Sequence, residues 1–215
     1  VAAFEDTFAA VRDGKAKYAM TPIENSVAGR VADIHRLMPE SGLYIVAENF
    51  MRVNHHLLAP KGATLKNLRV VRSHVHALSQ CSKVIRRLGV AAIVHADTAG
   101  AAKELAERND PTEAAIASSL AGRIYGLTPL LNNIEDAEHN TTRFVVLARK
   151  PVRRKRNEAP LMTTFVFRVR NVPAALFKAM GGFATNGVNL TKLESYMVGG
   201  FFDATQFYAD IEGHP

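Results

Sequence analysis

Short apolar segments alternate with amphipathic ones over residues 1–149, and this alternation limits the possible folds more than any other feature. Strand-like segments lie at 17–23, 43–47, 53–59, 70–71, 91–95, 114–117 and 144–149. The apolar periodicity between them predicts helices over 7–12, 26–38, 75–88, 97–108 and 118–125. Strands that alternate with helices are typical of an α/β fold with a mostly parallel sheet.

The pattern stops at a charged segment, residues 150–162, and then starts again. Strands are predicted at 163–169, 188–194 and 201–211, with a helix at 174–185 between the first two. This βαββ order is half of a ferredoxin-like unit. We therefore expect a domain over 1–149, a linker over 150–162, and a second, C-terminally incomplete unit over 163–215.

Composition excludes several classes of protein. The 215 residues are 47% hydrophobic, which is enough for a sizeable core, but no apolar run is long enough for a membrane span. Much of the net charge of +7 lies in Arg149-Lys150 and Arg153–Arg156, where no aromatic residues are interleaved, and Pro151 and Pro160 flank the second of these stretches. We interpret the run as a solvated linker and expect no nucleic-acid partner.

Cysteine usage and the start of the chain favour the cytoplasm. Cys81 is the single cysteine, so no internal disulfide forms, and no signal peptide is visible. No spacing of His, Cys, Asp and Glu fits a metal site, and neither a dinucleotide fingerprint nor a phosphate loop is present. We expect no metal and no cofactor.

Polar residues cluster where strands and helices meet. The run His139-Asn140-Thr141-Thr142-Arg143-Phe144 leads into an apolar strand. Comparable positions are occupied by residues 21–26, by Arg72-Ser73-His74 and by Asp97-Thr98. In open α/β folds, ligands collect at the carboxyl ends of strands, so convergence of these stretches would create an anion-binding cleft.

Simpler roles stay open for several of these residues. Asn25, Ser26 and Asp97 also fit helix caps, which is the default role of such residues, and a cap can contact a ligand as well. His74 and His76 fit either acid–base groups or turn histidines, and His55 and His56 are expected to face opposite sides of a strand. Cys81 is expected to be buried packing.

In family order, these motifs resemble those of the prephenate dehydratases. The matching elements are 22–26, His56-Leu57-Leu58, Ser73-His74 with Gln80-Cys81, 114–117, Tyr125-Gly126-Leu127 and 140–144. The resemblance implies a two-lobed catalytic domain like a type II periplasmic binding protein. The chain would cross to the second lobe near 53–59 and return near 140–147, with Thr142 and Arg143 facing the cleft.

The resemblance also implies roles for individual residues. Thr142 and Arg143 would be catalytic, with Thr142 supplying or positioning a proton for a leaving hydroxyl. Arg143 would bind a carboxylate, or would instead form a structural pair with Glu24 or Asp136. Substrate binding would involve Glu24, Asn25, Ser26, Ser73, His74, Thr98, Asn140 and Phe144.

The C-terminal unit resembles an ACT-type regulatory domain, which in this family binds L-phenylalanine. The residues implied in effector binding are Ala175, Leu176, Asn189, Leu190, Leu193, Glu194 and Ser195. The family's Glu-Ser-Arg-Pro motif reads Glu194-Ser195-Tyr196-Met197 here. The chain also starts downstream of the family's Gly-Pro-x-Gly-Thr segment, so the N-terminal strand is missing, and Asp97-Thr98-Ala99 replaces a Ser/Thr-rich motif.

The implied activity is that of a lyase, EC 4.2.1.51. It would convert prephenate to phenylpyruvate in L-phenylalanine biosynthesis, with feedback regulation by phenylalanine and a homodimeric or homotetrameric assembly. Arogenate dehydratase is a second interpretation, and a non-catalytic two-lobed solute-binding module is a third.

Overall fold

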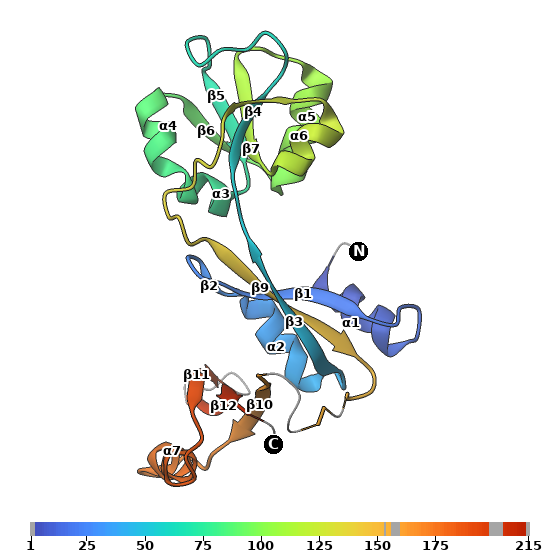
Figure 1. The fold of residues 1–215 in the computed structure, drawn as a ribbon, viewed down its shortest axis with the longest axis vertical. Coiled ribbons are helices and arrows are strands. Elements are labelled where there is room, and N and C mark those ends of the chain that lie inside the picture. The colour runs from blue at the N-terminus through green and yellow to red at the C-terminus, as the bar shows by residue number, and fades with distance from the viewer. Residues whose placement is uncertain (1–2, 153, 156–159, 198–203, 214–215) are drawn as a thin grey trace. The chain divides into compact units, whose positions relative to one another are not determined.

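A computed structural model describes residues 3–152, 154–155, 160–197 and 204–213. The helices are α1 Phe4–Arg12, α2 Ala32–Leu37, the 3-10 helix η1 Met38–Glu40, α3 Val75–Gln80, α4 Ser82–Leu88, α5 Thr98–Arg108, α6 Ser119–Tyr125 and α7 Ala175–Thr185. The strands are β1 Ala19–Asn25, β2 Gly29–Arg30, β3 Tyr44–Arg52, β4 His56–Ala59, β5 Val70–Ser73, β6 Ala91–Val94, β7 Glu113–Ala117, β8 Thr128–Leu131, β9 Thr141–Ala148, β10 Met162–Arg168, β11 Leu190–Met197 and β12 Ala204–Glu212. This content confirms the predicted α/β class (Figure 1).

The chain divides into two compact units. One comprises Val1–Thr21, Ala32–Glu48 and Val145–Pro215, and the other comprises Pro22–Val31 and Asn49–Phe144. A four-stranded sheet has the order β2-β1-β9-β3, a five-stranded sheet has the order β6-β5-β7-β4-β8, and a three-stranded sheet has the order β10-β12-β11.

The five-stranded sheet has a packed core on each face. Leu57 and Ile116 pack with α3 and α4 on one face, whereas Leu58 and Ala117 pack with α5 and α6 on the other. Figure 1 shows the two helix pairs on opposite sides of the strands. The alternation results from the two-residue period of a strand, which sends neighbouring side chains to opposite faces.

The prediction of a mostly parallel sheet is only partly correct. β5 pairs in parallel with β6 and β7, but β4 is antiparallel to both β7 and β8. The strand β8 was not predicted from the sequence, because Pro129 lies in its four residues. A proline is tolerated there since β8 is an edge strand and needs to pair on one side only.

The predicted helix over 26–38 is wrong in its first half, and Asn25 and Ser26 do not cap a helix. The chain makes a turn into β2 instead, and helix begins only at Ala32. The carboxamide oxygen of Asn25 accepts the backbone N–H groups of Val27 and Ala28, at 3.0 and 2.9 Å. Gly29 then takes the left-handed conformation at φ 79°, which favours glycine. Local side-chain bonding thus outcompetes the helical period.

The predicted helix over 75–88 is broken at Cys81. The Asp136 carboxylate accepts the Ser82 hydroxyl at 2.8 Å and the Lys83 N–H at 3.2 Å, so a new helix starts there. The Asp136 N–H in turn donates to the carbonyl of Gln80 at 2.6 Å. Cys81 is fully buried, as expected, and burial raises the pKa of its thiol to about 12.

The predicted cap at Asp97 is confirmed, and a second cap lies at the start of the helix predicted over 118–125. The Asp97 carboxylate accepts the Gly100 N–H at 2.6 Å, and the Ser118 hydroxyl accepts the Ala121 N–H at 3.2 Å. Each therefore satisfies a free N–H in the first turn of its helix, α5 and α6 respectively.

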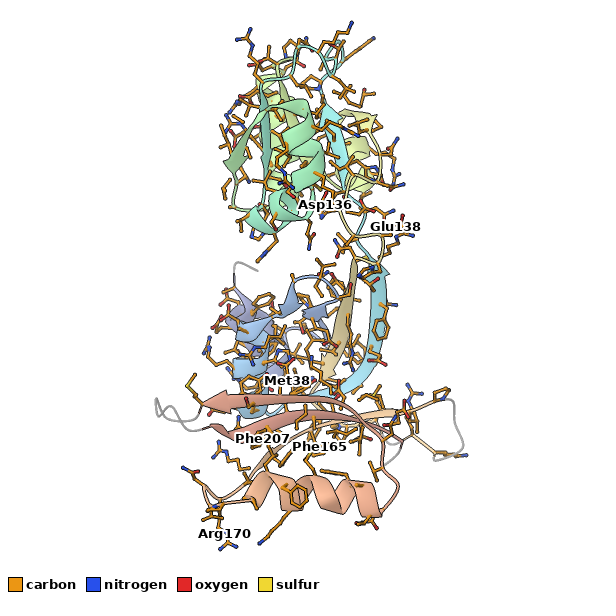
Figure 2. The ribbon with its side chains drawn as sticks, turned by 90° about the vertical axis from the view of Figure 1, so that its left-hand side faces the viewer. Met38, Asp136, Glu138, Phe165, Arg170 and Phe207 are labelled. Atoms are coloured by element: carbon orange, nitrogen blue, oxygen red, sulfur yellow. The ribbon has the colours of Figure 1, made fainter. Side chains whose placement is uncertain are left out.

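The predicted βαββ order of the C-terminal segment is confirmed. β12 is antiparallel to both β10 and β11, in a sheet whose core is aromatic. The rings of Phe165 and Phe167 lie 5.8 and 6.4 Å from Phe183 of α7, and Phe207 stacks on Phe167 at 5.4 Å. Figure 2 shows Phe165 and Phe207 on the side of the sheet that α7 covers.

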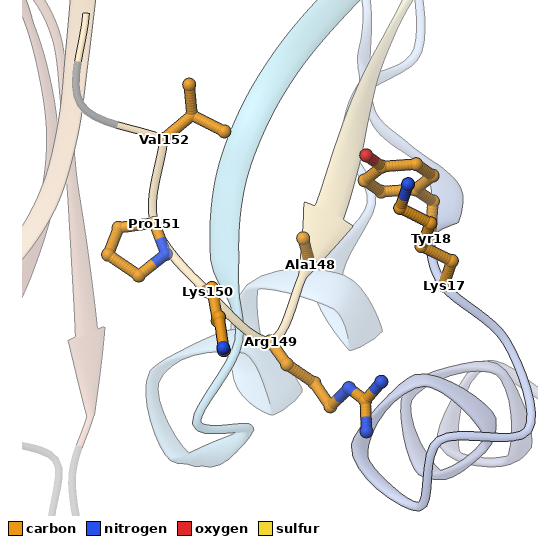
Figure 3. Close-up of a pocket in the computed structure, with 7 residues that line it drawn as sticks. All are labelled: Lys17, Tyr18, Ala148, Arg149, Lys150, Pro151 and Val152. Carbon is orange, nitrogen blue, oxygen red and sulfur yellow. The ribbon is translucent and has the colours of Figure 1, made fainter.

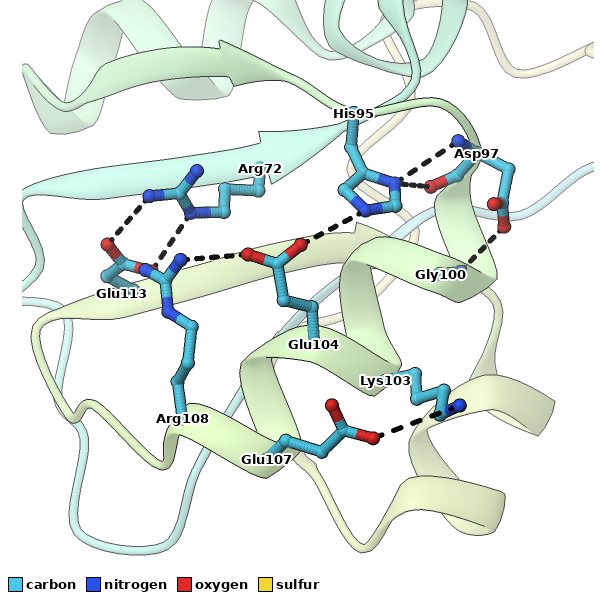
Figure 4. A network of polar contacts seen from close by, with 9 residues as sticks. All are labelled: Arg72, His95, Asp97, Gly100, Lys103, Glu104, Glu107, Arg108 and Glu113. Carbon is cyan, nitrogen blue, oxygen red and sulfur yellow. Dashed lines mark hydrogen bonds and ion pairs between the residues drawn. The ribbon is translucent and has the colours of Figure 1, made fainter.

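A row of alternating charges links α5 to β5 and β7 (Figure 4). Arg72 makes two hydrogen bonds to the Glu113 carboxylate, at 3.0 and 3.1 Å, and Arg108 also donates to it. Arg108 continues to Glu104 at 2.9 Å, which contacts His95 at 3.2 Å. The hydrogen bonds from Arg72 hold the pKa of Glu113 below its ordinary value, against the opposing effect of desolvation.

Glu113→Gln is expected to lower the free energy of unfolding by about 1–3 kcal/mol near neutral pH, because the largely buried Arg72 loses its charged partner. The folded-state pKa of Glu113 is depressed. Its contribution is therefore full above the ordinary value of about 4.3 and is lost as pH falls through the lower folded value. Denaturant unfolding of both proteins between acidic and neutral pH measures this.

Glu107→Gln provides the matched control, because within the described part of the chain Glu107 forms only an exposed pair with Lys103, at 3.8 Å. Its loss should change stability by less than about 0.5 kcal/mol. Equal effects of the two substitutions would contradict the importance of the Arg72–Glu113 pair.

Candidate active site

The candidate site forms where the end of β1 meets the start of β9. The Asn25 amide donates to the Thr142 hydroxyl at 3.0 Å and to the Asn140 side-chain oxygen at 2.8 Å. Asn25 and Thr142 are partly buried, and Asn140 is 1% exposed. Three residues that the sequence singled out are therefore brought together, although the partners of Asn25 lie 115 and 117 positions away along the chain.

The orientation of the Asn25 amide is fixed by its bonds. Its oxygen is occupied by the N–H groups of Val27 and Ala28, so its nitrogen must face Asn140 and Thr142. Because the Thr142 oxygen accepts from this nitrogen, the proton of the Thr142 hydroxyl is not used in that bond. The turn after β1 thus leaves Thr142 able to donate to a third group.

Ser26 connects the same two chain segments through the backbone. Its hydroxyl donates to the His139 carbonyl at 2.5 Å and accepts the Thr141 N–H at 2.9 Å. Its own N–H donates to the Thr141 carbonyl at 2.9 Å. These bonds fix the backbone on both sides of Asn140, so Ser26 holds the start of β9 in place.

Arg143 lies on the other face of β9. The strand's burial alternates, with Arg143, Val145 and Leu147 buried and Thr142 and Phe144 partly exposed. Arg143 pairs with Glu24 at 2.9 Å, and its guanidinium carbon lies 5.9 Å from the Phe50 ring centre. The pleat therefore places Thr142 and Arg143 on opposite faces of β9, and Phe144 shares the face of Thr142.

The other predicted site residues lie at the ends of strands in the five-stranded sheet. Ser73 is fully buried, and its hydroxyl donates to the Ile116 carbonyl at 2.6 Å. His74 is the N-cap of α3, where its ring accepts the His76 N–H at 3.3 Å, and Thr98 is the first residue of α5. Within the described residues, no hydrogen bond joins these three to Asn25, Asn140 or Thr142.

Two residues that sequence reasoning did not assign to the site extend the network. The Gln80 side-chain oxygen accepts the Asn140 amide at 2.9 Å and contacts Nε2 of His55 at 3.0 Å. Both His55 and His56 are buried, and His56 contacts Asn132 at 2.9 Å. One signal in the sequence could have pointed to Gln80 as a site residue. It is a polar side chain at the end of a helix, next to the buried Leu78 and Cys81.

A separate cavity of about 560 Å³ lies beside the end of β9 (Figure 3). It is lined by Lys17, Tyr18, Ala148, Arg149, Lys150, Pro151 and Val152, none of which was a predicted site residue. Arg149 lies against Gly14, where an added Cβ would come within 2.9 Å of its guanidinium nitrogen. The cavity's basic side chains are exposed, so it lacks the buried polar groups that distinguish the Thr142 network.

The described residues contain no group of three or more His, Cys, Asp or Glu that could hold a metal ion. In the same part of the chain, no helix has the length and apolarity needed to cross a membrane.

A model of the prephenate dehydratase family matches residues 1–152, which include the whole Thr142 network. The chain belongs to the prephenate dehydratase family. The members of this family are lyases. The match covers the five- and four-stranded sheets but ends before β10.

Proteins similar to this chain are also prephenate or arogenate dehydratases. A bifunctional N-acyl-homoserine lactone acylase/prephenate dehydratase from Komagataeibacter europaeus is 51% identical over 212 residues, covering 99% of this chain and 75% of the relative. Arogenate dehydratase/prephenate dehydratase 2 of Arabidopsis thaliana is 41% identical over 192 residues, covering 89% of this chain and 50% of the plant protein. The chain thus spans only half the length of that relative.

Among solved structures, prephenate dehydratase from Arthrobacter aurescens in complex with L-Phe is 30% identical, with a TM-score of 0.89. The alignment covers 100% of this chain and 71% of the other. Prephenate dehydratase structures have a two-lobed fold like that of periplasmic binding proteins, which confirms the expected two-lobed fold.

The residues that the resemblance implied for phenylalanine lie at two places in the C-terminal segment. Ala175 and Leu176 start α7, whereas Asn189 precedes β11 and donates to Glu212 at 2.8 Å. Leu190, Leu193, Glu194 and Ser195 lie along β11. Tyr196, at the position of the motif's arginine, stacks on the buried His35 of α2 with ring centres 5.9 Å apart.

Proposed function

We propose that this protein converts prephenate to phenylpyruvate, with Thr142 as the proton donor or positioning group at the leaving hydroxyl. The observation that carries the proposal is the bond from Asn25 to the Thr142 oxygen, which leaves the Thr142 proton for a ligand. Family membership supports the reaction class. The catalytic part would be residues 1–149, joined by the linker 150–162 to an ACT-type domain over 163–215.

The proposed reaction requires the protein to orient the substrate and to deliver one proton. The ring carboxylate leaves as CO2, its bonding electrons enter the ring, and the C–O bond to the hydroxyl breaks. A proton joins the departing hydroxide to give water, so no redox step or cofactor is needed. Because aromatisation makes the step strongly downhill, the protein contributes orientation and proton delivery.

Thr142 is a weak acid by itself, so its surroundings must assist. The Asn25 amide polarises the hydroxyl by donating to its oxygen, as a fixed dipole in a partly buried site. Ser26, Asn140 and Phe144 are proposed to bind the substrate beside Thr142, and Ser73, His74 and Thr98 are proposed to complete substrate binding from neighbouring strand ends. Arg143, with Glu24, is proposed to order the strand or bind a carboxylate.

Thr142→Val should lower dehydratase kcat by roughly 10² to 10³, the usual cost of removing one polar group that acts in the transition state. Thr142→Ser keeps the hydroxyl and should retain most of the rate.

A comparison of the two substrates separates the two dehydratase activities. Turnover of prephenate is measured as phenylpyruvate, and turnover of arogenate is measured side by side as phenylalanine.

Near wild-type turnover by a folded Thr142→Val protein would remove Thr142 from the mechanism. Prephenate that binds but is never converted by the unmodified protein would favour a solute-binding module instead.

L-Phenylalanine is proposed to be the effector, in a cytoplasmic homodimer or homotetramer, bound near Asn189–Ser195 and the start of α7. The relative crystallised with L-Phe supports this. Titration calorimetry on the full-length protein should show binding of phenylalanine and no binding of its D-enantiomer. No heat of binding for either would contradict the proposal.

A second candidate activity is hydrolysis of N-acyl-homoserine lactones, because the relative that is 51% identical is named for both activities. The amide bond would be cleaved to fatty acid and homoserine lactone. Chromatographic detection of the free fatty acid tests this, and Thr142→Val tells whether the two activities share a residue. No fatty acid above the rate of a protein-free control would exclude the acylase activity.

A further inference from the structure

A buried histidine stands at the far end of the Thr142 network. The series runs from Thr142 to Asn25, Asn140 and Gln80, with contacts of 3.0, 2.8 and 2.9 Å, and ends at His55 with 3.0 Å. Each contact is within hydrogen-bond distance. His55 is 6% exposed, so its ring is held by protein groups and not by solvent.

The chemistry of the amide fixes the tautomer of His55. The Gln80 side-chain oxygen can only accept, so Nε2 of His55 must carry the hydrogen. The same oxygen also accepts from Asn140. Two donors therefore meet at one oxygen, which fixes the orientation of the Gln80 amide and, through it, that of Asn140.

The backbone of His55 is also anchored on both sides. Its N–H donates to the Glu135 carboxylate at 3.0 Å, and its carbonyl accepts the Ile134 N–H at 2.9 Å. These two backbone bonds fix the position of the His55 ring, which in turn holds the Gln80 side chain. Catalytic groups need this kind of support, since a displacement of about 1 Å can reduce a rate roughly 10²-fold.

We propose that His55 is a positioning residue for the dehydratase reaction. Its Nε2–H holds Gln80, and Gln80 and Asn140 hold the Asn25 amide that orients the Thr142 hydroxyl. His55 does not touch the reacting atoms in this role. The proposal rests on the proposed function of Thr142 and adds a residue that sets the geometry of the same site.

The experiment compares His55→Phe with His55→Gln in the full-length protein. Phenylalanine keeps a ring of similar size but has no donor, and should lower kcat about 10- to 100-fold with KM within about 3-fold. Glutamine brings an N–H to nearly the position of Nε2 and should restore kcat to within a few-fold of wild type. Thermal unfolding identifies any variant that fails to fold.

His56→Phe is the matched control, because His56 is the neighbouring buried histidine but contacts Asn132, outside the network. Its kcat should stay near wild type. In a Thr142→Val background, His55→Phe should cause no further loss, since its effect passes through Thr142.

Wild-type kcat in a folded His55→Phe variant would overturn the positioning role. An equal loss in the His55→Gln variant would also overturn it, since that result indicates a packing role for the ring. Failure of the proposed function is a different outcome: the unmodified protein would then convert neither prephenate nor arogenate.

Discussion

The bond from the Asn25 amide to Thr142 is the interaction on which the candidate site depends. It requires the chain to turn after β1, because that turn occupies the amide oxygen and leaves the nitrogen to face β9. The same turn replaces a helix that the apolar period favoured. A short polar side chain with two backbone partners thus decides both the local fold and the orientation of a distant hydroxyl.

The sequence predicted correctly those features of the fold that depend on residues close together in the chain. Asp97 caps a helix as expected, and Ser118 caps the helix predicted over 118–125, because a cap depends on residues three positions away. Residues 140–144 were predicted as site residues from their motif, and the structure brings Asn140 and Thr142 of this run together with Asn25. The break at Cys81 was not predicted, because its cause, Asp136, lies 54 positions from Ser82. Gln80 and His55 escaped assignment for the same reason: their partners are remote in sequence.

The two faces of β9 carry side chains with different roles: Arg143 on one face forms a structural ion pair, and Thr142 on the other belongs to the candidate site. Arg143 is 7% exposed and paired with Glu24, as expected of a buried charge, which is costly without a partner. Thr142, on the opposite face, keeps a proton available. The motif places these residues side by side in sequence, but the pleat gives them different surroundings, and sequence adjacency alone did not reveal this.

The helix break at Cys81 has a consequence for how this protein can vary. α3 ends at Gln80, where Asp136 binds the carbonyl of Gln80 and starts the next helix. Each residue added to a helix rotates the next residues by about 100° around the helix axis. A one-residue insertion or deletion between His74 and Gln80 would therefore turn the Gln80 amide away from Asn140, although no site residue would have been replaced. The length of this short helix is thus under the same constraint as the identity of the residues it presents.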